Sequence, residues 1–143
     1  MAIKINDFKQ ISLETVKEMC KAAEEKAKSI SISIVFSAVD AGGNLMLLTR
    51  MENAFISSID IAANKAFTAL ALKQGTHEVT PVIQPGASLY GLQLTNNCRI
   101  STFGGGLPII VDDQVVGAIG VSGGTVEEDM SIAKYALDSI NDV

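Results

Sequence analysis

The sequence is poor in residues that bind metals and poor in charge. Its 143 residues include one histidine, two cysteines and no tryptophan, and charged residues make up 19% of the chain. Cys20 and Cys98 stand far apart and match no zinc-binding spacing, and one histidine cannot build a multidentate site. We therefore expect no metal site. We expect the two cysteines to be buried free thiols rather than a disulfide.

The charge balance and the lack of long apolar runs exclude further classes of protein. Eleven basic residues against 16 acidic residues give a net charge of −5, so the chain lacks the basic surface that binds nucleic acids. No window of 18 consecutive apolar residues predicts a transmembrane span. Residues 1–7 lack the basic and apolar regions of a secretory signal. We expect a soluble cytoplasmic protein without nucleic-acid or membrane partners.

Hydrophobic residues, by contrast, are abundant, at 48% of the chain. This composition excludes intrinsic disorder, and 143 residues suffice for one domain whose core needs no disulfide or metal. Much of the apolar excess falls on residues 55–74, which contain no glycine or proline and predict a helix that is apolar on nearly all sides. One small sheet cannot cover every side of such a helix. The pattern therefore predicts a homo-oligomer.

Two further helices and five strands complete the prediction. A 3-4 spacing of apolar residues predicts a helix over residues 13–30 with Ser12 as its N-cap. Thr125 and Glu128 have the spacing of a capping box that opens a last helix. Strands are expected at residues 31–39, 45–50, 100–103, 108–111 and 114–121. The order α-β-β-α-(short helices)-β-β-β-α predicts an α+β fold, a five-stranded antiparallel sheet with helices packed on it.

Seven of the 12 glycines lie between residues 104 and 124. Residues 104–106 are all glycine, which lets the backbone approach a neighbour or a ligand closely. Gly117 and Gly120, inside a predicted strand, indicate a bulge or a close approach by a bulky group. Residues 123–124 resemble a phosphate loop, but no nucleotide fingerprint is present and the acidic residues 127–129 would repel a phosphate. Tight turns and a ligand-lining role both stay open for these glycines.

Lys65 and His77 are the residues with the clearest chemical potential. Lys65 lies beside a narrow polar stripe that includes Thr68 on the otherwise apolar segment 55–74. A buried ammonium must either pair with a carboxylate or reach a cleft, where it meets an anionic ligand. His77 is the only imidazole, and two interpretations stay open for it: a surface or capping residue, or a heme or metal ligand.

Four segments together resemble the GlcG/HbpS family. They are VDAGGNL (39–45), AANKAFTA (62–69), FGGGLPI (103–109) and VGAIGVSGGT (116–125). The resemblance covers nearly the whole chain and includes the C-terminal domain of PduO-type corrinoid adenosyltransferases. It implies one profilin-like domain over residues 1–143, homo-oligomers, and a diol or glycerol dehydratase context. Some relatives bind heme through a histidine near the first helix, whereas here only His77 is available.

We expect a non-enzymatic protein that binds a small ligand or acts as an accessory, with a tetrapyrrole (heme or corrinoid) as the candidate ligand. The ligand is expected between one helix face and two glycine loops, lined by Lys65, Thr68, Gly104, Gly105, Gly106, Ser122, Gly123 and Gly124. One alternative is a small enzyme acting on a hydroxy or carbonyl metabolite, with Lys65 as its charged group and Thr68 or Asp129 assisting. The other is a purely structural, oligomeric interaction module.

Overall fold

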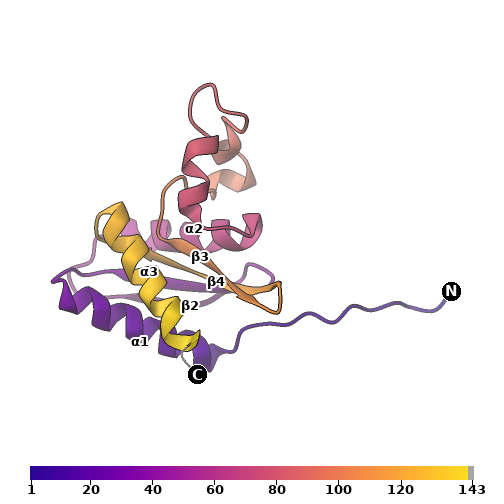
Figure 1. Cartoon of the computed structure of the whole chain (residues 1–143), viewed down its shortest axis with the longest axis horizontal. Helices are drawn as coiled ribbons and strands as arrows, with labels where there is room; N and C mark the ends of the chain where they lie inside the picture. The colour runs from indigo at the N-terminus through magenta and orange to yellow at the C-terminus, as the bar shows by residue number, and fades with distance from the viewer. Residues whose placement is uncertain (142–143) are drawn as a thin grey trace.

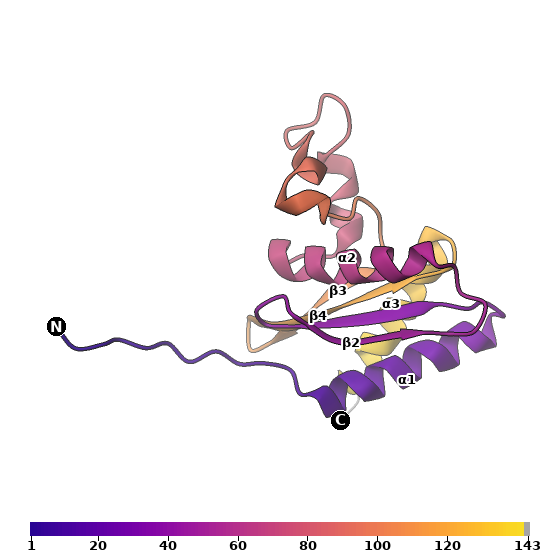
Figure 2. The same cartoon turned by 180° about the vertical axis from the view of Figure 1, so that it is seen from behind.

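An antiparallel sheet lies between two layers of helices. The computed structural model describes residues 1–141. Its elements are α1 (Leu13–Ser29), β1 (Val35–Asp40), β2 (Leu45–Arg50), α2 (Ser57–Leu72), η1 (Thr76–Glu78), η2 (Thr80–Val82), η3 (Leu92–Leu94), η4 (Asn96–Cys98), β3 (Gly106–Val111), β4 (Gln114–Ser122) and α3 (Val126–Asn141). Helices α1 and α3 pack together on one face of the sheet, and α2 covers the other (Figure 1; Figure 2). The short η turns form a protrusion beyond α2.

The sheet has four strands in the order β2-β1-β4-β3, and every neighbouring pair is antiparallel. A bulge interrupts the pairing of β3 with β4, because Ile109 pairs with Gly117 while Ile110 pairs with Val115. The carbonyl of the extra residue, Val116, accepts a hydrogen bond from the N–H of Ile11 at 2.9 Å. The predicted bulge or close approach at the strand glycines is therefore confirmed.

The prediction of five strands is wrong, because residues 100–103 form no strand in the described structure. Their backbone groups bond to side-chain hydroxyls instead of to a neighbouring strand. The N–H of Ser101 donates to Thr68 Oγ1 at 2.7 Å, and the carbonyl of Thr102 accepts from Thr80 Oγ1 at 2.6 Å. The α+β class, with helices packed on an antiparallel sheet, is confirmed. The likeness to profilin stays a prediction.

Two predicted helix starts, those of α1 and α3, are confirmed by capping bonds, whereas α2 begins at Ser57 rather than residue 55. Ser12 Oγ accepts from the N–H of Thr15 at 3.1 Å at the start of α1. Before α3, the N–H of Glu128 donates to Thr125 Oγ1 at 3.2 Å, and the N–H of Thr125 donates to Glu128 Oε1 at 3.0 Å. These bonds satisfy N–H groups that have no partner within the helix. None of the helices within residues 1–141 is long and apolar enough to cross a membrane.

Helix α2 lies very close to the sheet, and small residues on both sides make this possible. Ala62 and Ala66 of α2 are fully buried against β4. A Cβ on Gly120 would lie 2.7 Å from the backbone nitrogen of Ala66 and would collide with the carbonyl of Ala62. Directly before α2, Phe55 and Ile56 are 68% and 77% exposed in the single chain, and their cover by a neighbouring subunit stays a prediction.

We expect Gly120→Ala to lower the free energy of unfolding by about 2–3 kcal/mol, because the added Cβ meets backbone atoms and α2 must move away from the sheet. Denaturant titration followed by circular dichroism measures this loss. Gly42→Ala is the matched control, since a Cβ at this exposed turn meets only side-chain atoms of Asn44 and Asp40. Its expected cost is below about 1 kcal/mol, and equal losses for the two variants would contradict the packing argument.

Candidate functional site

A buried ion pair between Lys65 and Asp129 lies at the centre of the predicted site. Lys65 belongs to α2 and Asp129 to the first turn of α3, and their side chains are 0% and 4% exposed. Lys65 Nζ donates to Asp129 Oδ2 at 2.9 Å and to the carbonyl of Val121 at 2.8 Å. The second carboxylate oxygen, Asp129 Oδ1, accepts from the N–H of Gly124 at 2.8 Å. One lysine thus joins α2, β4 and α3.

Burial and pairing act on this ion pair in opposite directions. Burial lowers the pKa of Lys65 and raises the pKa of Asp129, because both charged forms lose contact with water. The ion pair and its hydrogen bond counteract both shifts, and the backbone N–H groups of Gly124 and Gly123 also lower the pKa of Asp129. Each charge is therefore kept in the interior by the other. The paired state of Lys65, one of the two possibilities left open by the sequence, is the one observed.

Phe103 covers the ion pair from outside. The ring centroid of Phe103 lies 5.1 Å from Lys65 Nζ, a cation–π distance, and its side chain is 39% exposed. The sequence reasoning did not include Phe103 in the site. The available signal was its position directly before the glycine run at residues 104–106.

The glycines of residues 104–106 let this loop approach α2. Gly105 has φ +125°, and a Cβ there would lie 2.6 Å from both Lys65 Nζ and the carbonyl of Val121. The N–H of Gly106 donates to the buried hydroxyl of Thr76 at 2.9 Å. The close approach to a neighbour is therefore confirmed for these glycines, and a ligand-lining role stays a prediction.

Two predicted polar residues bond to groups other than the ion pair. The hydroxyl of Thr68 donates to the carbonyl of Asn64 at 2.7 Å and accepts from Ser101, at the base of the protrusion. The hydroxyl of Ser122 donates to Ser58 Oγ at 3.0 Å.

Gly123 and Gly124 lie where β4 passes into α3. Gly124 reaches the ion pair through its N–H, as described above. A Cβ on Gly123 would collide with the carbonyl of Ser33. The structure thus brings Lys65 together with Gly105 and Gly124, whereas Thr68 and Ser122 have other partners.

His77 lies at the surface beside the same glycine loop. Its side chain is exposed on η1, so the imidazole is accessible. A Cβ on Gly104 would lie 3.3 Å from His77 Cβ and 2.8 Å from Met130 Cγ, which places an imidazole and a thioether around one glycine. Within residues 1–141, no group of three or more His, Cys, Asp or Glu side chains is placed to hold a metal ion.

The two cysteines differ in exposure. Both are free, as expected, but only Cys20 is buried, and the expectation that Cys98 is buried is wrong because it lies on the exposed η4 turn. Cys20 Sγ lies 3.2 Å from Thr49 Oγ1 and 3.7 Å from a carboxylate oxygen of Glu24. Burial raises the pKa of the Cys20 thiol to about 11, so this cysteine stays protonated at neutral pH.

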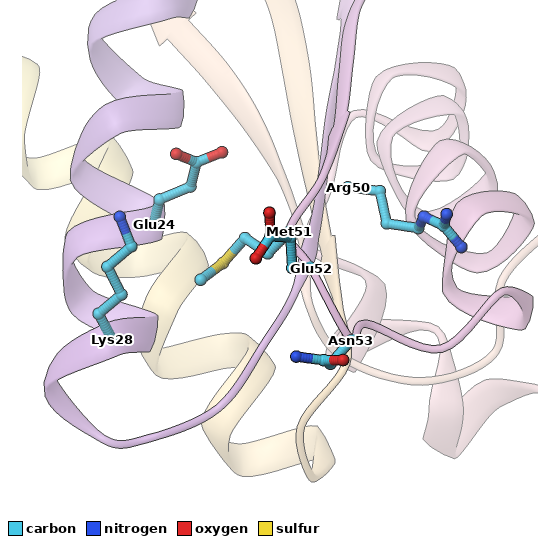
Figure 3. A pocket seen from close by; sticks show the side chains of 6 residues that line it. All are labelled: Glu24, Lys28, Arg50, Met51, Glu52 and Asn53. Atoms are coloured by element: carbon cyan, nitrogen blue, oxygen red, sulfur yellow. The ribbon is translucent and has the colours of Figure 1, made fainter.

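A cleft that the sequence did not indicate lies between α1 and the end of β2 (Figure 3). Its volume is about 490 Å³, and it is lined by Glu24, Lys28, Arg50, Met51, Glu52 and Asn53. The lining holds two carboxylates and two cations, so the cleft favours neither an anion nor a cation. None of these residues belongs to the predicted site.

The layered sheet, with its glycine loops closed by a buried lysine–aspartate pair, is a small α+β domain. Residues 11–138 match the family model described as haem degrading protein HbpS-like. The chain belongs to this family, and the resemblance stated from the sequence is confirmed.

Similar proteins extend the comparison. The chain is 54% identical over 140 residues to the uncharacterized 15.0 kDa protein of the dhaT-dhaS intergenic region of Citrobacter freundii, which covers 98% of this chain and 99% of that protein. The crystal structure of Klebsiella pneumoniae protein ORFY has a TM-score of 0.96 at 53% identity, over 100% of this chain and 99% of that one. The crystal structure of a PduOC:heme complex has a TM-score of 0.90 at 41% identity, over 92% and 96%. The chain spans 39% of the length of the corrinoid adenosyltransferase PduO of Salmonella typhimurium, with 41% identity over 131 residues.

We expect Lys65→Met to lower the free energy of unfolding by about 3–5 kcal/mol, because Asp129 then stays buried without its cation. The loss of the ammonium also raises the pKa of Asp129 further above its ordinary value of 3.8. When the pKa of a carboxyl is higher in the folded than in the unfolded chain, the folded chain is favoured only while that carboxyl is protonated. Its ionisation lowers the free energy of unfolding. The deficit relative to wild type should therefore be smallest below pH 3.8 and grow as the pH rises through the raised pKa.

Urea titrations at several pH values measure this deficit. Lys134→Met, at an exposed position of α3, is the matched control and should change the stability by less than about 0.5 kcal/mol. A deficit for Lys65→Met that does not vary with pH would show that Asp129 is not the group left unpaired.

Proposed function

We propose that the protein binds a tetrapyrrole without acting as an enzyme, and that heme is the ligand to test first. The observation that carries this proposal is the likeness to the PduOC:heme complex, which extends over 92% of this chain at a TM-score of 0.90. At 41% identity, this relative is close enough to share the details of the fold as well as its outline.

The surface beside the 104–106 loop fits such a ligand. Heme iron is commonly held by an imidazole, and His77 presents one in an exposed position. Phe103 and the half-buried Met130 supply apolar surface near it, and Gly104 offers no side chain that would obstruct a flat ring. In this proposal His77 ligates the iron and the aromatic ring of Phe103 packs against the macrocycle. When bound, the heme supplies the metal centre, and the chain supplies the imidazole and an apolar wall.

Of the eight residues predicted to line the ligand, Gly104 belongs to this surface, and Lys65, Gly105 and Gly124 support it from behind. The Lys65–Asp129 pair holds the backbone around Val121 and Gly124. The carbonyl of Gly105 accepts from the N–H of Val121 at 2.9 Å, so the loop that carries Phe103 and Gly104 is fixed to the same point. We propose that these residues position the binding surface.

An accessory role in diol or glycerol dehydratase metabolism belongs to the same proposal. Two observations support it: a 41% identical relative is a corrinoid adenosyltransferase, and a 54% identical one is named for its position between dhaT and dhaS. A cytoplasmic homo-oligomer is the form in which we expect the protein to act.

We expect wild-type protein to shift the main absorption band of heme and to saturate at one heme per chain in a micromolar titration. His77→Ala should weaken the apparent affinity at least tenfold and alter the band, because the iron loses its imidazole. Ser88→Ala, at an exposed position of the protrusion, is the control and should titrate like wild type.

Two outcomes would contradict different parts of the proposal. No spectral shift with the wild-type protein would exclude heme as its ligand. A shift that is identical in wild type and His77→Ala would place the heme away from His77.

A further inference from the structure

The first ten residues form an extended arm that lies away from the body of the molecule. Both views show it leaving the start of α1 and running outward from the body (Figure 1; Figure 2), with Lys9 near its base paired to Asp112. Every residue of the arm is exposed, and Ile3, Ile5 and Phe8 are 92%, 84% and 85% exposed. Within residues 1–141, these apolar side chains are therefore left almost uncovered.

A backbone hydrogen bond and an ion pair hold the base of the arm against the sheet. The bulge in β4 turns the carbonyl of Val116 toward Ile11, which donates to it at 2.9 Å. A Cβ on Gly117 would lie 2.7 Å from Ile11 Cγ2. The glycine therefore leaves the space that the Ile11 side chain occupies. Lys9 pairs with Asp112 at 3.0 Å. The arm therefore leaves the body in a defined direction.

The arm has the pattern of a strand that packs on a surface. Met1, Ile3 and Ile5 alternate with Ala2 and Lys4, which places the large apolar side chains on one side of an extended segment. Exposed apolar strands of this kind are unfavourable in water and associate with other chains. The apolar side of the arm is therefore available to another molecule.

Charge and reach favour a second copy of this chain. Lys4 and Lys9 against Asp7 give the arm a net charge of +1. Because the whole chain has a net charge of −5, the remaining residues carry −6. Ten extended residues span roughly 33–36 Å, which is about the diameter of a small domain. In a twofold dimer, each copy covers the arm of the other. Two arms are then buried, so the apolar area covered is twice that of one arm. We propose that the arm of one copy lies across the body of a second copy and holds the two together.

Sedimentation of the full chain and its variants tests this exchange. We expect the full chain to sediment as an oligomer at micromolar concentration, and the variant I3K/I5K to have a dissociation constant at least tenfold higher. The control A2K/N6K adds the same two charges to the arm at positions outside the apolar side, and should stay oligomeric. Circular dichroism should be unchanged in all three proteins, since residues 2–6 are exposed and lie outside every helix and strand.

A capture experiment distinguishes arm exchange from any other contact. A chain lacking residues 2–8 keeps Lys9 and Ile11 and keeps the surface that receives an arm. Immobilised full chain should therefore retain the shortened chain, whereas immobilised shortened chain should not retain itself. A monomeric full chain, as expected if the arm binds a different kind of molecule, overturns the proposal. So do equal dissociation constants for I3K/I5K and A2K/N6K, or retention of the shortened chain by itself.

Discussion

The contact between Lys65 and Asp129 is the interaction on which the rest of the structure depends. Removing an ammonium and a carboxylate from water costs several kcal/mol for each ion, and only a direct pair with further hydrogen bonds offsets that cost. Here the remaining bonds come from the carbonyl of Val121 and the N–H of Gly124. The pair therefore fixes the end of β4 and the start of α3 relative to α2.

The close seating of α2 is the second constraint. Gly120 meets backbone atoms of Ala62 and Ala66, and Gly105 meets the end of the Lys65 side chain. The small residues in the segments that resemble the family are thus explained in this chain by the close approach of neighbouring atoms. They leave little space inside the domain at these points, so the surfaces available to other molecules lie at its rim: around Phe103 and His77, at the start of α2, and along the arm.

Local features were predictable from the sequence, and contacts between distant residues were not. The caps at Ser12 and Thr125 depend on residues three positions apart, and both predictions were right. Residues 100–103 have the composition of a strand, but the hydroxyls that bond to them belong to Thr68 and Thr80, 33 and 22 residues away from their partners.

In the candidate site, too, local features could be predicted and contacts between distant residues could not. The need of Lys65 for a partner could be deduced from its apolar helix, yet its pairing with Asp129 spans 64 residues and no local pattern indicates it. The arm was missed for a different reason. Its alternation of Ile3 and Ile5 is too short to predict an element, and its significance depends on where the body of the molecule lies.

The separation of Lys65 and Asp129 by 64 residues affects the order in which the domain can pack. A nascent chain that has emerged only as far as β4 can form the sheet, but Lys65 then lacks its carboxylate. Seating α2 on the sheet at that stage would bury an uncompensated ammonium. We therefore expect α2 to reach its final packing on the sheet only once α3 supplies Asp129 as the partner of Lys65.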